Sequence, residues 1–391
     1  MSSKTNMSPE MASPTTGKPP VQLRRFRSPG TNLLAVVAPP LTEIHLTVTP
    51  AGFESPIFMA GRLAEYLHAW NATVVRLIIF GSVAASPALV AALRQSLDDP
   101  ELPLTWVEGA ACDGRPIAGI QVHAIAGARI TTLSAQGQPH GRLWADAAAT
   151  HCVFSGLGPR RVAANRAGQT RDTFETLQAQ LTQAGMSLKN VARTWFFLDD
   201  ILSWYDDFNR VRNDFFARTE LRPDSVPAST GVSGRNPVGS AVTLAAWAVK
   251  PHNPASTVVR IVPSPKQCPA PAYGSAFSRA MEILSAGFRQ ILVSGTASIE
   301  PGGKTAHAGD APAQIDLTME VVESILESRG LNFADVSRAT AYFRSGADAP
   351  LFAEWLERHE LRSLPVINAC CDICRDDLLF EIEVDAIKAD G

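Results

Sequence analysis

The sequence predicts an α+β fold in which one unit of helices and strands is repeated three times. The segment Leu181 to Leu198 aligns without gaps with Leu326 to Phe343, at a constant offset of 145 residues. Leu63 to Phe80 is a fainter copy, offset by 117 residues from the second. Each copy contains the pattern Val-x-Arg where a strand begins. An internal repeat of this kind indicates that one supersecondary unit recurs along the chain.

Around the Val-x-Arg strand, each copy shows the same order of elements: a helix, the strand, a second helix and two further strands. The first helices are expected at Met59–Trp70, Thr173–Ala184 and Ile315–Arg329. The second helices are expected at Ala85–Leu97, Trp204–Phe216 and Ala349–Glu357. The last strands are expected at Ile120–Ile125, Ala241–Val249 and Leu378–Val384, and opening hairpin strands at Cys152–Ser155 and Ile291–Ser298.

Helices that share one side of a mixed sheet form an α+β layer, and three such layers can close around an axis with sheets inside and helices outside. Three independent beads are the alternative. The segments between the units, Ala126–Ala147 and Lys250–Ala272, carry enough apolar residues to pack, which favours the closed arrangement. The chain is then expected to be a monomer.

Composition narrows the class of partner. The chain has 391 residues, 46% of them hydrophobic, and a net charge of −3, so it lacks the basic field of a nucleic-acid-binding or membrane-surface protein. A small-molecule partner is expected. Residues 1–30 are polar, contain no apolar run, and are expected to form a disordered tail without a signal or membrane segment.

The six cysteines show no disulfide framework, which favours reduced thiols and a cytoplasmic location. Cys371 and Cys374 form one C-x-x-C, but no second pair or closely spaced histidine completes a zinc site, so no metal is expected. Neither a G-x-G-x-x-G turn nor a P-loop occurs, and no cofactor is implied.

The stretch Leu364 to Ala386 holds the most unusual residues. Its strand carries Glu381 and Glu383 two positions apart, so both side chains share one face of an apolar strand. Carboxyls in that position either line a cleft or face solvent, and the apolar neighbours favour the cleft. Cys374 precedes the strand closely. Alternation along the preceding arm would put Cys370 on the same face as Cys374.

The second and third units resemble the RidA/YjgF family of reactive-intermediate deaminases. The resemblance rests on the Ser-Gly strand motif, a glutamine before the helix, the G-x-x-L/F-x-x-V turn and the run LLFEIEVDA. That family forms trimers with clefts between subunits. The resemblance therefore implies three RidA-like units in one chain, at residues 40–126, 148–250 and 273–388, forming a pseudo-trimer. The family's substrate-binding arginine, two residues after the terminal proline, is replaced here by Ile367, so deaminase chemistry of that type is not expected.

Four longer motifs resemble the chorismatase family more closely. They are Pro227 to Pro237 (PASTGVSGRNP), Tyr273 to Ala280 (YGSAFSRA), Val293 to Ser298 (VSGTAS) and Cys374 to Glu383 (CRDDLLFEIE). The resemblance spans residues 40 to 388 and implies that chorismate, a dianion bearing an enol ether, is the substrate. Release of pyruvate requires a proton at the enolpyruvyl methylene carbon.

Glu381 is the candidate acid, because a buried carboxyl of raised pKa suits this proton transfer. The positions aligned with Glu381 and Glu383 in the second unit are Ala246 and Ala248, so the acid belongs to the third unit alone. The two substrate carboxylates need cationic partners, for which arginine is best suited. The candidate substrate contacts are Arg235, Arg279, Arg344, Tyr273, Gly295 and Thr296.

Arg193 and Arg338 recur in the repeats and are more consistent with a structural role; Arg375 fits either role. Cys374 stands where hydroxybenzoate-forming chorismatases resemble one another in having cysteine. The implied products are pyruvate and 3- or 4-hydroxybenzoate, formed when the ring hydroxyl rather than water attacks the cationic intermediate. The alternatives are hydrolysis of chorismate to a dihydroxycyclohexadienoate, with Cys374 as a packing residue, and a RidA-like binding protein without catalysis.

Overall fold

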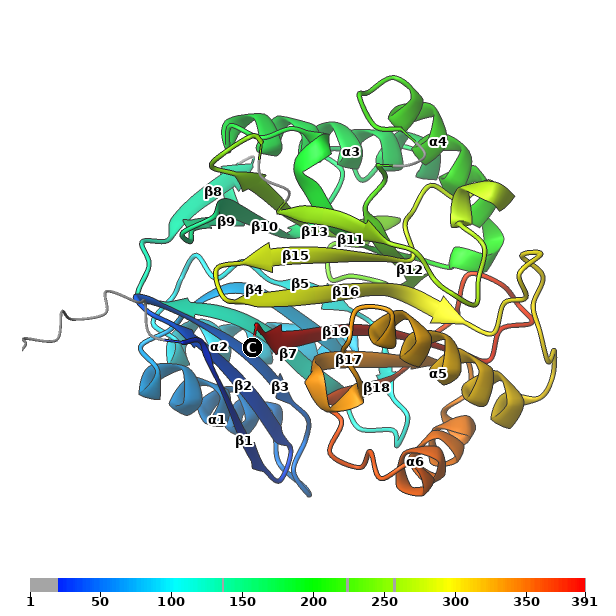
Figure 1. Cartoon of the computed structure of the whole chain (residues 1–391), viewed down its shortest axis with the longest axis horizontal. Coiled ribbons are helices and arrows are strands. Elements are labelled where there is room, and N and C mark those ends of the chain that lie inside the picture. Colours follow the sequence, from blue (N-terminus) through cyan, green and yellow to red (C-terminus); the bar gives the residue numbers. More distant parts are fainter. Residues whose placement is uncertain (1–19, 136, 223–224, 256–257, 391) are drawn as a thin grey trace, which may run out of the picture.

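The computed structural model describes residues 20–390 except 136, 223–224 and 256–257, and contains three sheets with helices on the outside (Figure 1). The first sheet has the strand order β1-β2-β3-β7-β4-β5. Its strands are β1 (Gln22–Ser28), β2 (Thr31–Ala38), β3 (Leu41–Val48), β4 (Thr73–Gly81), β5 (Thr105–Val107) and β7 (Ile117–Ala126), and its helices are α1 (Pro56–Ala69) and α2 (Ser86–Ser96).

The second sheet has the order β12-β11-β13-β10-β9-β8 and carries helices α3 (Arg166–Gln183) and α4 (Tyr205–Ala217). Its strands are β8 (Thr131–Ala135), β9 (Gln138–Ala145), β10 (Ala149–Leu157), β11 (Val191–Leu198), β12 (Ala228–Ser233) and β13 (Val242–Pro251).

The third sheet has the order β14-β15-β16-β19-β17-β18-β6 and carries helices α5 (Ala311–Glu327) and α6 (Ala349–Arg358). Its strands are β6 (Ala110–Ala111), β14 (Val259–Val262), β15 (Ala280–Ser285), β16 (Phe288–Ala297), β17 (Val336–Phe343), β18 (Val366–Cys370) and β19 (Phe380–Ala389). Strand β6 comes from the first unit and pairs with β18, which joins the two units directly.

Each repeated strand is built in the same way. Strands β4, β11 and β17 each pair in parallel with a short strand and antiparallel with the last strand of their unit. In all three, the antiparallel register shifts at the Val-x-Arg pattern. A bulge at that point turns the strand locally and re-aims the side chain that follows. The sequence repeat is therefore also a repeat of backbone geometry.

The repeated glycines have a conformational reason. Gly185 and Gly330 follow the ends of α3 and α5 with φ of 67° and 69°, and Asn71 holds the corresponding place after α1 with φ of 48°. Glycine adopts this left-handed conformation without steric cost, and asparagine tolerates it. These residues end the helix and turn the chain into the Val-x-Arg strand.

Apolar residues cover both faces of the sheets. Three outer cores form where each pair of helices packs on its own sheet. A fourth core lies between the sheets and includes Phe80, Phe197 and Tyr342, one from each unit. The ring of Phe80 lies 6.1 Å from that of Phe197 and 6.0 Å from that of Tyr342. The three sheets thus pack against one another and are not separate beads.

The three Val-x-Arg arginines converge beside this inner core. The guanidinium groups of Arg76, Arg193 and Arg338 lie 4.5, 4.8 and 5.3 Å from the ring of Trp195. All three arginines are buried. A guanidinium over an indole face gains from the ring's negative electrostatic potential, which favours this arrangement.

Carboxylates on β19 compensate these charges. Glu383 accepts hydrogen bonds from Arg193 and Arg338, each at 2.7 Å. Asp385 accepts one from Arg338 at 2.5 Å and lies 3.6 Å from Arg76. Arg193 thus joins the second unit to the third, and Arg338 also donates to Oε1 of Gln121 in the first unit at 2.7 Å, which agrees with a structural role for both.

Three expectations need correction. Residues 22–28 form strand β1, paired along its length with β2, so the predicted tail of residues 1–30 extends too far; residues 1–19 lie outside the described part. The predicted linker 126–147 contains β8 and β9, which extend the second sheet as a hairpin. The first helix of each unit begins several residues earlier than expected, because the capping residues Ser55, Asn165 and Asp310 start α1, α3 and α5. The second helices begin within one residue of the expected position. Within the described residues, no helix combines the length and apolarity needed to cross a membrane.

Candidate active site

Strand β19 places three acidic side chains on its inner face. Glu381, Glu383 and Asp385 alternate with apolar residues that pack outward against α5 and α6. Glu383 and Asp385 are held by arginines. Among the residues that the structure describes, none forms an ion pair or hydrogen bond with Glu381, although this carboxyl is only 5% exposed. The strand therefore carries one buried acid without a cationic partner next to two that are compensated.

The environments push the pKa values of the neighbouring glutamates apart. Burial, with a smaller effect from the negative charge of Glu383, raises the pKa of Glu381 to about 8, and Arg193 counteracts this in part. Burial would also raise the pKa of Glu383, but the charges of Arg338 and Arg193 outweigh it and hold that pKa below its ordinary value. Glu381 is consequently protonated at neutral pH, while Glu383 is ionised.

Gly295 makes room for the Glu381 carboxyl. A Cβ atom at position 295 would lie 2.1 Å from Oε1 of Glu381, so any side chain would displace the acid. The backbone N–H of Gly295 donates to Oγ1 of Thr230 at 2.9 Å, and that hydroxyl donates to Oε2 of Glu383 at 2.5 Å. Thr230 therefore ties the pocket wall to the compensated carboxylate.

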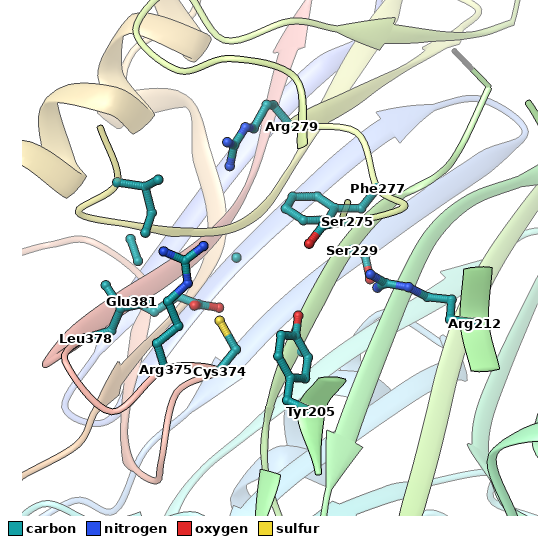
Figure 2. Close-up of a pocket in the computed structure, with 14 residues that line it drawn as sticks. Tyr205, Arg212, Ser229, Ser275, Phe277, Arg279, Cys374, Arg375, Leu378 and Glu381 are labelled. Atoms are coloured by element: carbon teal, nitrogen blue, oxygen red, sulfur yellow. The ribbon is translucent and has the colours of Figure 1, made fainter. Parts of the chain in front are cut away.

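Glu381 opens into a pocket of about 580 Å³, the space at its mouth included, between the second and third sheets (Figure 2). Helix α4, strands β12, β16 and β19, the segment before β15 and the loop before β19 all contribute. The lining residues are Tyr205, Arg212, Ser229, Gly231, Ser275, Phe277, Arg279, Gly295, Ala297, Ile299, Cys374, Arg375, Leu378 and Glu381.

Three arginines line the pocket. Arg375 donates to the Gly303 carbonyl at 2.8 Å, and Arg279 donates twice to the Cys268 carbonyl, at 3.1 and 3.0 Å. Arg212 donates to Oδ1 of Asn209 at 2.7 Å. In Figure 2, Arg375 and Arg212 enter from opposite sides. Several fixed guanidinium groups around one small pocket favour a ligand that carries more than one negative charge.

Cys374 lies beside the acid. Burial and the charge of Glu381 raise the pKa of its thiol to about 12, so the sulfur is protonated at neutral pH. A hydrogen bond from the Tyr205 side chain to this sulfur counteracts the rise in part, and both side chains reach the pocket in Figure 2. Cys374 therefore acts as a neutral, polarisable wall of the pocket.

The expected alternation of Cys370 with Cys374 is wrong. Strand β18 ends at Cys370, and residues 371–379 form a loop, so strand geometry does not extend to Cys374. The thiol of Cys370 points instead to the Arg344 carbonyl at 3.8 Å, away from the pocket-lining residues.

The predicted substrate contacts divide into two groups. Arg279 and Gly295 line the pocket. Arg235 is largely exposed and paired with Glu108, and Arg344 lies 3.8 Å from Asp372; neither lines the pocket, because each stands at the surface beside an acidic partner. Thr296 is buried on the face of β16 opposite Gly295, and its hydroxyl donates to the Ser294 carbonyl at 2.9 Å. Tyr273 ends the turn Ala270–Tyr273, and its side chain lies outside the described part.

Sequence reasoning missed Tyr205, Arg212, Ser229 and Phe277, and left Arg375 undecided. Tyr205 and Arg212 are seven residues apart on α4 and therefore share a helix face. Arg212 is only 2% exposed, although arginine is rarely buried. An arginine on the apolar face of a predicted helix was the available signal.

Strand pairing also corrects the alignment of the acid with the other units. The fourth residue after each Val-x-Arg arginine is Phe80, Phe197 or Tyr342, and their partners are Gly119, Thr243 and Glu381. Thr243, not Ala246, is therefore the equivalent of Glu381 in the second unit. The conclusion that only the third unit carries a carboxyl at this position is unchanged.

Comparison with known proteins agrees with this architecture. Residues 147–259 match the family described as "Endoribonuclease L-PSP". A crystal structure of a chorismatase superposes with a TM-score of 0.61 at 20% identity, covering 80% of this chain and 93% of the other. The chain is thus a mixed α+β protein with a RidA/YjgF-like domain.

Two curated relatives show more specifically which family the chain belongs to. The chain is 30% identical over 237 residues to the 3-hydroxybenzoate synthase of Streptomyces hygroscopicus, covering 55% of this chain and 68% of the relative. It is 29% identical over 215 residues to a chorismatase of Streptomyces rapamycinicus, covering 50% and 63%. The chain belongs to the chorismatase family.

Proposed function

We propose that this protein converts chorismate to pyruvate and a hydroxybenzoate, either the 3- or the 4-isomer, with Glu381 as the general acid. One observation carries the proposal: a buried, unpaired carboxyl with a pKa of about 8 lies in an arginine-lined pocket. A general acid works best when its pKa lies near the working pH. The names of the curated relatives support chorismate as the substrate.

The pocket residues suit each part of this substrate. Arg212, Arg279 and Arg375 balance the two carboxylates, while Glu381 donates its proton to the methylene carbon of the enol ether. The double bond then becomes an oxocarbenium ion, and Glu381 becomes a carboxylate. Arg193, whose charge already favours the ionised form of Glu381, stabilises the carboxylate produced.

The next step decides the product. When the ring hydroxyl attacks the cationic carbon, a cyclic ketal forms. Loss of a ring C–H proton with cleavage of one ring C–O bond then aromatises the ring, and the hemiketal left on the other ring oxygen collapses to hydroxybenzoate and pyruvate, which together contain all the atoms of chorismate. When water attacks, one water molecule is added and the ring product is a non-aromatic diol. Cys374, held by Tyr205, fills space beside the acid, and we assign it the exclusion of water from the cation.

We further infer that the chain is a monomer arranged as a pseudo-trimer of RidA-like units. The support is the repeated bulge at each Val-x-Arg strand and the convergence of one arginine from each unit on Trp195. In this arrangement the pocket occupies the cleft between the second and third units.

Incubation of the purified protein with chorismate tests the proposal. Chromatography should show an aromatic hydroxybenzoate and pyruvate in equal amounts. If the products are pyruvate and a non-aromatic diol, the reaction is hydrolysis of chorismate and the proposed formation of hydroxybenzoate is wrong. Binding of chorismate without any product would favour a RidA-like binding protein.

Replacement of Cys374 by alanine should change the ring product while pyruvate release continues. The substitution leaves Glu381 in place but opens space for water beside the cation. The measurement is the ratio of hydroxybenzoate to diol at matched pyruvate yield, and the diol fraction should rise. Cys370→Ala is the matched control, because Cys370 lies outside the pocket and its loss should leave the ratio unchanged. An unchanged ratio in Cys374→Ala would make Cys374 a packing residue.

The reaction should slow as the pH rises, because the proposed mechanism requires the protonated form of Glu381. Because the pKa of Glu381 is raised to about 8, the carboxyl holds its proton below that pH and loses it above. We therefore expect kcat/KM to be constant near neutral pH and to fall about tenfold per pH unit on the alkaline side. A profile of kcat/KM that stays flat to about pH 9.5 would remove Glu381 as the acid.

A further inference from the structure

Two histidines and a glutamate meet on the inner face of the first sheet, outside the pocket of Glu381. Glu43 and His45 share one face of β3, and His123 on β7 stands directly opposite His45 in the strand register. All three side chains are at most 2% exposed. One ligand atom from each lies within 4.8 Å of the other two.

The separations match the needs of one metal ion. Oε2 of Glu43 lies 3.2 Å from Nε2 of His123 and 3.5 Å from Nε2 of His45. Ligands of a tetrahedral zinc ion, at about 2.0–2.1 Å from the metal, are about 3.3 Å from one another. The two imidazole rings stack, with centroids 4.5 Å apart and an interplanar angle of 15°. The rings must therefore tilt toward each other on metal binding, so that both nitrogen lone pairs point at the same ion.

The histidines also lack the partners that buried rings normally have. Within the described part of the chain, Nδ1 of neither His45 nor His123 has a hydrogen-bond partner, and Nε2 of His45 faces Glu43 at 3.5 Å. Buried polar atoms are almost always satisfied, and an unsatisfied one points to a ligand or water. Gln290 on β16 donates to Oε2 of Glu43 at 2.9 Å and so fixes the carboxylate from the third sheet.

The cluster has a route to solvent and a favourable balance of charge. Glu43 lines a cavity of about 1740 Å³, open space at its mouth included, that is also lined by Asp146, Asp390 and Arg129. The acidic residues outnumber the basic one along this route, which favours the entry of a cation. Arg76 lies near His123, but Asp385 at 3.6 Å compensates its charge.

We propose that Glu43, His45 and His123 bind one divalent transition-metal ion, with Zn²⁺ the best fit. Two imidazoles and one carboxylate are a ligand set that such ions prefer, and Gln290 is the outer partner that orients the carboxylate. The ion would join β3 to β7 and, through Gln290, to β16. Its role is structural, and the site is independent of the reaction at Glu381.

Metal binding by the full-length protein tests the site directly. Protein stripped with a chelator is titrated with Zn²⁺, Co²⁺ and, as a negative control, Mg²⁺, and bound metal is measured by elemental analysis. One Zn²⁺ per chain and a rise in Tm on its addition are expected. The Co²⁺ form should show visible d–d bands without a sulfur-to-metal charge-transfer band. Such a band would place the metal at the cysteines, and no bound metal would overturn the proposal.

Variants locate the ion. Glu43→Gln and His45→Gln keep side-chain size and should abolish Co²⁺ binding, and Gln290→Ala should weaken it about 10- to 100-fold. His151→Gln is the matched control: His151 is a buried histidine paired with Asp146 outside the cluster, and its loss should leave affinity unchanged. Wild-type affinity in a folded Glu43→Gln protein would reject the site. If a variant fails to fold, the Co²⁺ spectrum of the unmodified chain decides.

Discussion

Replacing Glu381 by glutamine should lower the rate of pyruvate release by about 10² to 10⁴, because the amide keeps the shape of the side chain but has no acidic proton to donate. Burial should not change, since the amide fills the same space opposite Gly295. The measurement is kcat for pyruvate formation, alongside chorismate affinity and Tm. Affinity and Tm should stay near those of the unmodified protein.

Glu381→Asp is the matched control for this experiment. It keeps a buried carboxyl but withdraws it by one methylene, so activity should lie between that of the unmodified protein and that of Glu381→Gln. Near-normal turnover by folded Glu381→Gln would show that another group delivers the proton. Glu383 is a poor substitute, because Arg193 and Arg338 hold it ionised.

Replacing Arg338 by methionine should lower the free energy of unfolding by about 3 to 5 kcal/mol, the usual cost of removing one partner from a buried ion pair. Arg338 is 3% exposed and bonds to both Glu383 and Asp385. Methionine fills similar space without charge, leaving Glu383 with Arg193 and Asp385 with Arg76. Denaturant unfolding measures the change.

Arg344→Met is the control for Arg338→Met. Arg344 lies six residues further along the chain, is partly exposed and has its nearest carboxylate at 3.8 Å, so its loss should cost about 0 to 1 kcal/mol. If the two substitutions lower the free energy of unfolding equally, the buried cluster stabilises the fold no more than a surface ion pair does. Stability would then not explain why three arginines are buried at the centre.

The repeated unit could be predicted because its signals are local. Glycine is favoured after α3 and α5 because the backbone there has a positive φ. Apolar residues recur along the helices because one face packs against the sheet. Both patterns can be recognised in the sequence. The same holds for Glu381 and Glu383, whose spacing puts them on one strand face. Strand β1 was missed because its side chains are mostly exposed and polar, which resembles the composition of a tail.

The pocket could be predicted only in part, because its members come from five separate places in the chain. Arg212 reaches it from α4 and Arg375 from the loop before β19, and nothing local in the sequence joins them. The alignment of Glu381 with Ala246 was wrong because the segments between the repeated strands and the last strands differ in length. Only hydrogen-bonded pairing reveals that Thr243 is the equivalent.

The convergence of three arginines on the ring of Trp195 has a consequence for how the three units are ordered. Trp195 contacts one guanidinium from each unit, while the equivalent strand positions in the first and third units hold Ile78 and Thr340. Three identical chains around an axis would each bring the same side chain to it, and three indoles would compete for this one place. Each unit supplies one arginine, the second unit adds the ring and the third adds the carboxylates, so the three units are not interchangeable. Covalent linkage in this order lets an asymmetric centre form within an approximately repeating frame.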